Sequence, residues 1–133
     1  MNADAPVVLI SGCSTGIGRT LAKEFAARNW RVFATARKPS SLDDLKAPNV
    51  KTAALDVTDE KSIHACVESV IAEAGKIDML VNNAGLLLIG PLVELEIREL
   101  RREYETNVIG LAALTNAVVP HMIKRTSGKI VNI

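Results

Sequence analysis

Three glycines between a buried strand and an amphipathic helix constrain this chain more than any other feature of its sequence. The apolar run Val7–Ile10 is followed by Ser11, and the stretch from Gly12 to Gly18 has the pattern G-x-x-x-G-x-G. From Gly18 onward, apolar residues recur at helical spacing. A continuous apolar run of this kind is typical of a strand buried on both faces. The sequence therefore predicts a strand, a tight turn and a helix in succession.

Each glycine of this turn has a distinct physical role. Gly12 allows a tight turn out of the strand, Gly16 lets the backbone approach a phosphate, and Gly18 lets the helix pack close to the sheet. The N–H groups and the dipole of the helix then face an anion. We expect the pyrophosphate of a dinucleotide to bind at the turn residues Gly12, Ser14, Thr15, Gly16, Ile17 and Gly18.

The alternative is a turn of glycines that binds no ligand. The position between a strand and a helix argues for a binding motif, because that context is the one in which such motifs operate. The spacing differs from G-x-G-x-x-G, and no Lys-Ser/Thr pair follows Gly18. The missing pair argues against an ATPase or a GTPase.

Strand-like and helix-like segments alternate along the chain. We expect strands at Val7–Ile10, 30–36, 51–55, 77–81 and 129–133, and helices from Gly18, from Thr58 or Asp59 to Gly75, and over about 97–124. Pro39-Ser40-Ser41 marks a loop. The apolar stripe of the last helix is predicted at Leu100, Tyr104, Val108, Leu111, Leu114 and Val118. This alternation predicts an α/β fold with one Rossmann-like, doubly wound parallel sheet in a single domain, residues 1–133.

Two cations follow the second predicted strand. In NAD-binding sites an acidic residue about 20 residues further on binds the ribose 2′-hydroxyl. Arg37 and Lys38 stand here instead, and an arginine binds a phosphate in bidentate fashion. The alternative is a solvated basic loop. The pair predicts NADPH as the cofactor in preference to NADH.

Further motifs follow the third, fourth and fifth predicted strands. They are Asp56-Val57, Asn82-Asn83-Ala84-Gly85, Asn107 in the long helix, and residues 128–133. Together with the glycine turn they resemble the short-chain dehydrogenase/reductase family in its non-extended form. The resemblance covers the whole chain, and N-N-A-G is its most specific part. It implies a sheet of strand order 3-2-1-4-5 that ends with its fifth strand.

The resemblance also implies a role for each motif. Asp56 and Val57 would contact adenine; Asn83, Ala84 and Gly85 would lie against the adenosine ribose; Asn107 would help to hold a water in a proton relay to the catalytic Lys. Each has a simpler alternative. Asp56 is also suited to a helix start, and residues 83–85 to an ordinary turn. For Asn107, a poor helix former inside a helix, the simpler interpretation is a polar residue that satisfies a helix kink, which would be part of the same arrangement.

Two stretches narrow the resemblance. Cys13-Ser14-Thr15 and the run 33–39 are similar to a subgroup that contains retinol dehydrogenases, 17β-hydroxysteroid dehydrogenases and 1-acyldihydroxyacetone-phosphate reductases. The apolar run 86–89 is compatible with a lipid-like substrate, although we expect it to form core and helix-packing surface in preference to a substrate wall. The resemblance further implies a homo-oligomer in the full-length form.

The catalytic residues of the family lie beyond the residues of this sequence. In the family a Ser follows the fifth strand and a Tyr-x-x-x-Lys pair follows on the next helix. Here Tyr104 is followed by Val108 where the motif has Lys, and Ser127 precedes the fifth strand. We therefore expect a truncated form or fragment of a longer reductase. It would hold the cofactor without transferring hydride, and it would expose the edge of an unfinished sheet.

Composition limits the partners, metal sites and cellular locations that we expect for this protein. The 16 basic and 15 acidic residues nearly balance, which argues against a nucleic-acid partner or a charge-driven membrane role. Cys13 and Cys66 are too few for a disulfide framework and have no metal-ligand spacing, so no metal site is predicted. The apolar stretch 108–120 is too short to span a bilayer. We predict a cytoplasmic protein with at most peripheral contact with the endoplasmic reticulum or a lipid droplet.

The leading functional prediction is an NADP(H)-dependent oxidoreductase. Its small-molecule substrate would be a ketone or a secondary alcohol. The alternative, from another class, is a non-catalytic dinucleotide-binding or regulatory fragment. A Ser…Tyr-x-x-x-Lys continuation of the chain would distinguish the two.

Overall fold

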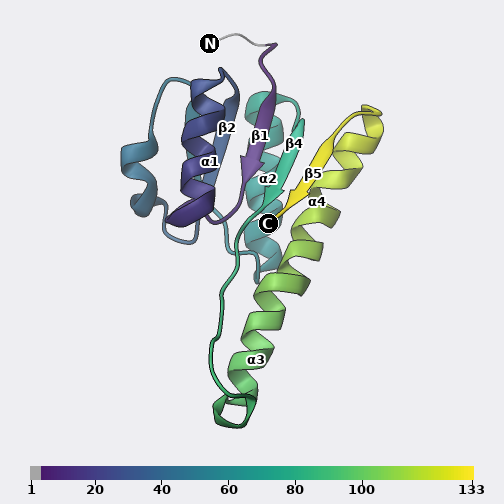
Figure 1. Ribbon diagram of the computed structural model, residues 1–133. Helices are drawn as coiled ribbons and strands as arrows, with labels where there is room; N and C mark the ends of the chain where they lie inside the picture. Colours follow the sequence, from purple (N-terminus) through teal and green to yellow (C-terminus); the bar gives the residue numbers. More distant parts are fainter. Residues whose placement is uncertain (1–3) are drawn as a thin grey trace.

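Five parallel strands form a single sheet in the order β3-β2-β1-β4-β5 (Figure 1). The structure is a computed structural model that describes residues 4–133. The strands are β1 (Val7–Ile10), β2 (Arg31–Ala36), β3 (Val50–Ala54), β4 (Met79–Asn82) and β5 (Lys129–Asn132). The predicted Rossmann-like α/β class and the predicted strand order are both confirmed.

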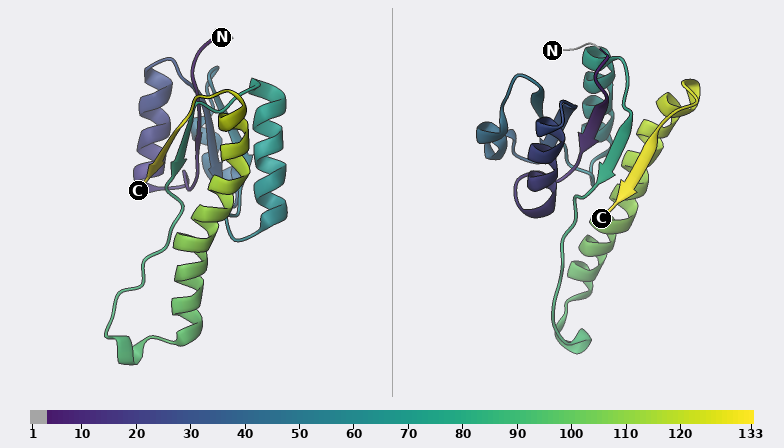
Figure 2. Two further views of the ribbon diagram at one scale, coloured as in Figure 1. Left: turned by 90° about the vertical axis from the view of Figure 1, so that its right-hand side faces the viewer. Right: turned by 45° about the horizontal axis from the view of Figure 1, so that its top comes forward.

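Helices cover both faces of the sheet (Figure 2). The helices of the described residues are α1 (Gly16–Ala27), η1 (Pro39–Leu45), α2 (Glu60–Ala74), η2 (Leu92–Glu94), α3 (Ile97–Tyr104), η3 (Glu105–Gly110) and α4 (Leu111–Lys124). In β1, Val7 and Leu9 pack into the core shared with α2 and α4, whereas Val8 and Ile10 pack into the core shared with α1 and η1. The alternation arises because successive side chains of a strand point to opposite faces. Both faces are buried, which is why β1 is uniformly apolar.

The segment predicted as a loop at Pro39 is a 3-10 helix instead. Pro39 occupies its first turn, where the missing backbone N–H costs nothing. Leu42 and Leu45 lie three residues apart, and therefore on one side of this helix, and both are buried. The loop prediction was wrong because it weighed only the turn-forming residues and not the two leucines that follow.

The ends of α2 follow the sequence prediction. Asp59, and not Thr58, is the N-cap, because its carboxylate accepts a hydrogen bond of 2.9 Å from the N–H of Lys61. Gly75 ends the helix in the left-handed conformation, with φ 74°. These two residues set the length of α2, and four residues separate its end at Ala74 from the start of β4 at Met79.

The predicted long helix is continuous from Ile97 to Lys124, with a π-helical stretch, η3, in its middle. Its second half packs on the sheet, but its first half extends beyond the carboxyl ends of the strands (Figures 1 and 2). The predicted apolar stripe is therefore correct only in its second half. Leu114 and Val118 are buried, whereas Tyr104 is 60% exposed and Val108 is 43% exposed.

The apolar run 86–89 was expected to be mostly core and helix-packing surface. Leu87 and Ile89 are instead 76% and 85% exposed. They lie on the segment that runs beside the projecting half of the long helix (Figure 1). That prediction was wrong for these two side chains, because no core lies beneath a segment that extends past the sheet.

Within residues 4–133, one helix, Ile97–Lys124, is long and apolar enough by length and composition to cross a membrane. The apolar stretch 108–120, predicted from the sequence to be too short to span a bilayer, is only part of this helix. Core helices of soluble proteins meet the same criterion, and this one contributes Leu114, Val118 and Met122 to the buried core.

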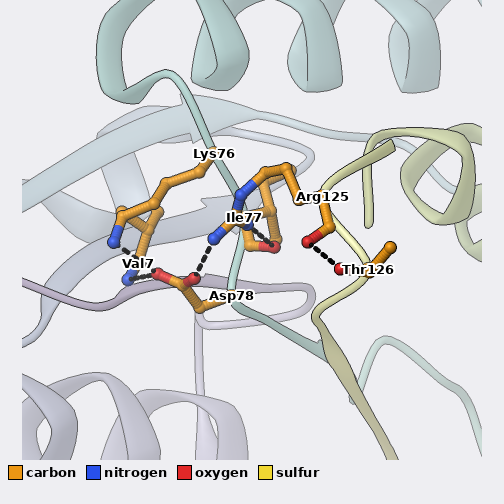
Figure 3. Close-up of polar contacts among 6 residues, drawn as sticks. All are labelled: Val7, Lys76, Ile77, Asp78, Arg125 and Thr126. Carbon is orange, nitrogen blue, oxygen red and sulfur yellow. Dashed lines mark hydrogen bonds and ion pairs between the residues drawn. The ribbon is translucent and has the colours of Figure 1, made fainter. Parts of the chain in front are cut away.

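Asp78 connects several elements at the end of the sheet where β1 and β4 begin (Figure 3). Its carboxylate accepts hydrogen bonds of 2.8 Å from the N–H of Val7 and from Arg125, and it pairs with Lys76 at 3.1 Å. These contacts join the starts of β1 and β4 to the residue that ends α4. Partial burial opposes ionisation of Asp78, but the hydrogen bonds, the one from Arg125 foremost, hold its pKa below the ordinary value.

Candidate functional site

A cleft of about 410 Å³ lies at the carboxyl ends of the strands. The chain winds outward from β1 to β3 and then crosses back to β4, so the order reverses beside β1. Ligands of open α/β sheets bind at such a switch point. Of the residues predicted from the sequence, those lining the cleft are Gly12, Ser14, Thr15, Gly16, Ile17, Arg37, Asp56, Val57, Asn83, Ala84 and Gly85.

The first two glycines of the turn adopt left-handed backbone conformations. Gly12 has φ 72° and Gly16 has φ 60°. A Cβ atom on Gly12 would lie 2.8 Å from the Cα atom of Ala84, so this position is also closely packed. A Cβ atom on Gly16 would meet nothing within 4 Å. Gly16 therefore leaves room in the cleft that a side chain would fill.

Gly18 differs from the other two because it does not line the cleft. A Cβ atom there would come within 2.5 Å of the carbonyl oxygen of Gly12 and within 2.4 Å of Nδ2 of Asn83. The close approach is thus between α1, the glycine turn and the N-N-A-G segment. The predicted close packing at Gly18 exists, but its partner is this turn and not the face of the sheet.

The first turn of α1 has no internal cap. Thr15 is the N-cap residue in extended conformation, yet its side chain forms no capping hydrogen bond, and the first helical turn carries no acidic residue. The first N–H groups of a helix have no partner within the helix and attract anions. Ser14, Thr15 and Gly16 are all exposed in the cleft. An anionic group bound here would find free donors and open space.

Ser11 and Asn83 join the two strand ends that flank the switch point. The hydroxyl oxygen of Ser11 accepts hydrogen bonds from the N–H groups of Asn83 (3.0 Å) and Ala84 (2.9 Å). The side-chain amide of Asn83 donates in return to the carbonyl oxygens of Ser11 (3.1 Å) and Gly12 (2.9 Å). The sequence indicated Asn83 but not Ser11, whose position directly before Gly12 was the available signal.

The cations predicted at the end of β2 are separated by the structure. Arg37 lines the cleft, whereas Lys38 does not. Both side chains are exposed, and neither forms an ion pair within residues 4–133. Of these two cations, Arg37 alone brings its unpaired charge to the cleft wall, because adjacent residues at a strand end point in opposite directions.

Asp56 follows β3 and faces the same cleft. Its carboxylate accepts hydrogen bonds from the hydroxyl (2.7 Å) and the N–H (2.9 Å) of Thr58. The side-chain and backbone hydrogen bonds from Thr58, with the charge of Arg37 as a smaller contribution, hold its pKa below the ordinary value. Asp56 therefore does not cap α2, which is the task of Asp59, and its ionised carboxylate is available at the cleft.

Asn107 lies in η3, the π-helical stretch of the long helix. Its Oδ1 atom accepts a hydrogen bond of 2.8 Å from the N–H of Leu86, and its Nδ2 atom donates one of 2.7 Å to the carbonyl oxygen of Leu86. A Cβ atom on Gly85 would lie 3.1 Å from Oδ1 of Asn107. Such π-helical stretches are frequent at functional sites. Asn107 thereby holds the chain leaving the N-N-A-G segment, but it does not itself line the cleft.

Part of the cleft wall was not predicted from the sequence. Thr58, Leu86, Arg102 and Thr106 also line it. Arg102 and Thr106 are four residues apart on the long helix, just before Asn107, so they share one face. That spacing was the signal that would have indicated them, whereas Thr58 is found only through its contact with Asp56.

The fold and the cleft together define the structural class of this protein. A parallel sheet in this order, with a glycine turn leading into an uncapped helix at its switch point, is a Rossmann-like α/β protein. The residues present fit a dinucleotide on structural grounds, because Gly16 opens into empty space and the N–H groups of α1 face the same cleft.

Comparisons with known proteins place the chain within that class. The short chain dehydrogenase family model matches residues 6–133, and the chain belongs to this family. It is 36% identical to the 3-oxoacyl-(acyl-carrier-protein) reductase FabG of Escherichia coli strain K12, over all of this chain and 56% of that protein. It is 39% identical to retinol dehydrogenase 8 of Bos taurus, over 97% of this chain and 44% of that protein.

The fold agrees with a solved structure of the same family. A short-chain dehydrogenase from Streptomyces avermitilis superimposes with a TM-score of 0.93 at 41% identity. The match covers 97% of this chain and 48% of that one. The chain spans about half the length of the curated relatives it matches. Both of these relatives are oxidoreductases by name, one a reductase and the other a dehydrogenase.

Proposed function

We propose that the complete protein is an NADP(H)-dependent oxidoreductase that reduces a ketone or oxidises a secondary alcohol. The observation that carries the proposal is the cleft at the switch point, where the uncapped start of α1 and the free charge of Arg37 face one cavity. No acidic residue ends β2, where an NAD-binding protein has its ribose-binding acid. The family membership supports an oxidoreductase and a nicotinamide cofactor.

Different residues of the cleft would bind different parts of the cofactor. The turn at residues 12–18 would hold the pyrophosphate, Arg37 the 2′-phosphate, and Asp56 the amino group of adenine. The backbone at residues 83–85, held by Ser11, would lie against the ribose. The bound nicotinamide would supply the hydride donor or acceptor. Lys38 lies beside Arg37 outside the cleft wall and would add only long-range attraction.

The family resemblance assigns proton transfer to a Ser and a Tyr-x-x-x-Lys pair, and the 133 residues contain no Tyr-x-x-x-Lys pair. The single tyrosine, Tyr104, has Val108 four residues on, where the family resemblance places a Lys. We therefore assign cofactor binding to this chain and hydride transfer to the complete protein. Asn107, through its two bonds to Leu86, would position the chain beside the reacting end of the cofactor.

The substrate we propose is a small, lipid-like molecule. Leu87 and Ile89 are exposed on the segment that follows the N-N-A-G motif and extends past the sheet. One relative is a retinol dehydrogenase. The protein would be cytoplasmic with at most peripheral membrane contact, and the full-length form a homo-oligomer.

Titration of the chain with NADPH and NADH, followed by nicotinamide fluorescence, tests the proposal. We expect saturable binding of NADPH, weaker binding of NADH, and no oxidation of NADPH by this chain when a ketone is added. Preferred binding of NADH would overturn the cofactor assignment, and no binding of either would overturn the site. The complete protein should oxidise NADPH in the presence of a ketone.

A further inference from the structure

The side chain of Arg19 joins three segments at the rim of the cleft. Its Nη1 atom donates hydrogen bonds of 3.3 Å to the carbonyl oxygens of Ser14 and Ser41, and its Nη2 atom pairs with the carboxylate of Asp44. Arg19 lies on α1, Ser14 in the glycine turn, and the other two residues in η1. The Arg19 side chain is only 23% exposed, so it is held in place and does not move freely in solvent.

An isolated exposed ion pair contributes little to stability. Arg19 is different because its planar guanidinium donates to acceptors on two separate segments at once. The hydrogen bond from Arg19 also holds the pKa of Asp44 below its ordinary value, so the carboxylate is charged at neutral pH. Figure 1 shows the short η1 helix beside α1, and the buried Leu42 and Leu45 pack it into the core on the α1 side.

Ser41 connects Arg19 to the short segment that carries Arg37. Only Arg37 and Lys38 lie between the end of β2 at Ala36 and the start of η1 at Pro39. The N–H and the hydroxyl of Ser41 both donate to the carbonyl oxygen of Lys38, at 3.0 Å and 2.7 Å. The two-residue connection is therefore held at one end by the sheet and at the other by Ser41.

We propose that Arg19 is a positioning residue for a phosphate on the adenosine ribose. It does not contact the phosphate, because its guanidinium already serves Ser14, Ser41 and Asp44. It holds η1 against the glycine turn and thereby fixes the distance between Arg37 and the α1 N-terminus. The 2′-phosphate and the 5′-phosphate of one adenosine would then bind at Arg37 and at the α1 N-terminus, which are held at a fixed separation. The inference rests on the proposed function and adds the residue that determines its phosphate preference.

The test compares two adenosine fragments, 2′,5′-ADP and 5′-AMP, by isothermal titration calorimetry with the full chain. We expect the unmodified chain to prefer 2′,5′-ADP, and Arg19→Met to reduce that preference about tenfold while the affinity for 5′-AMP changes by about twofold or less. The matched control is Arg28→Met. It removes the arginine that directly follows α1, which pairs with Glu24 at 3.6 Å and does not line the cleft, and it should leave the preference unchanged.

A second variant keeps the test decisive if Arg19→Met does not fold. Asp44→Asn leaves Arg19 and its carbonyl contacts in place and removes only the tie to the carboxylate, so it should lose part of the preference. Folded Arg19→Met with the full preference for 2′,5′-ADP would overturn the role of Arg19 alone; if Arg19→Met is unfolded, a full preference in Asp44→Asn does the same. Equal binding of the two fragments by the unmodified chain would overturn the NADP assignment, and this inference with it.

Discussion

The side-chain amide of Asn83 donates a hydrogen bond of 2.9 Å to the carbonyl oxygen of Gly12, which ties the N-N-A-G segment to the glycine turn. The two residues are 71 positions apart in the sequence. The same amide also donates to Ser11 and occupies the space that a Cβ atom on Gly18 would need. Two motifs that are separate in the sequence thus form one structural unit at the cleft.

Asn83→Ala should weaken both stability and cofactor binding. Losing two hydrogen bonds from a half-buried amide should cost about 1–3 kcal/mol of unfolding free energy, measured by urea denaturation. The NADPH affinity should fall as well. Asn49→Ala is the matched control, because its amide also donates to two backbone carbonyls, those of Ala26 and Trp30. It should lose similar stability and retain NADPH affinity; equal affinity losses would contradict the prediction.

Alanine at Gly12 and at Gly16 should have different effects. Gly12→Ala combines a left-handed backbone with a clash against Ala84, so we expect a loss of about 2–5 kcal/mol. Gly16→Ala carries the backbone cost alone, about 1–2 kcal/mol. Its methyl group would project into the open cleft and lower NADPH affinity about tenfold in a folded protein. Unchanged NADPH affinity in folded Gly16→Ala would place the pyrophosphate elsewhere.

Arg37 and Lys38 should contribute unequally to cofactor choice. Arg37→Met should lower NADPH affinity about tenfold to a hundredfold and leave NADH affinity nearly unchanged, since a charge-assisted contact to one phosphate is lost. Lys38→Met removes the same charge but not a residue of the cleft wall, and its effect should be several times smaller. Fluorescence titration with both cofactors measures this. Similar losses in the two variants would show long-range attraction and no specific contact.

Asn107→Ala should loosen the chain that leaves the N-N-A-G segment. The Leu86 N–H loses its acceptor, so its hydrogen exchange should accelerate about five- to tenfold. Glu103→Ala is the comparison, because Glu103 accepts the N–H of Leu88 at 3.1 Å. Asn107→Ala should accelerate exchange chiefly at the Leu86 N–H, and Glu103→Ala chiefly at the Leu88 N–H. Unaltered protection of Leu86 in Asn107→Ala would show that the segment is held by other contacts.

Asp78 should make stability depend on pH. Its pKa is lowered in the folded state, so its contribution is fully present above the unfolded pKa of about 3.9 and disappears as the pH falls through the folded value. Asp78→Asn should cost about 1.5–3 kcal/mol at pH 7, and the deficit relative to the unmodified chain should shrink below about pH 4.

The control for Asp78→Asn is Asp43→Asn, which breaks an exposed pair with Lys46. That pair should contribute less than about 1 kcal/mol. Urea denaturation at several pH values measures both variants. A deficit of Asp78→Asn that stayed constant down to acid pH would show that the carboxylate charge is not what stabilises this end of the sheet.

Some of these features were readable from the sequence because their cause is local. A left-handed turn requires Gly12, a helix start favours Asp59, and a helix end favours Gly75. The buried strands were found because parallel strands covered on both faces are continuously apolar. The two errors in predicted burial also share one cause. Tyr104 and Ile89 are apolar in pattern, but exposure depends on whether another element lies opposite them.

The sequence by itself determined the order of the elements, the glycine turn and the family, since these depend on neighbouring residues and on short motifs. Only the tertiary structure decided which residues face the cleft. It separates Arg37 from Lys38, brings Arg102 and Thr106 into the wall, and joins Arg19 to Ser41. The physical reason is that facing a common cavity depends on the packing of segments distant in the chain, which no local pattern encodes.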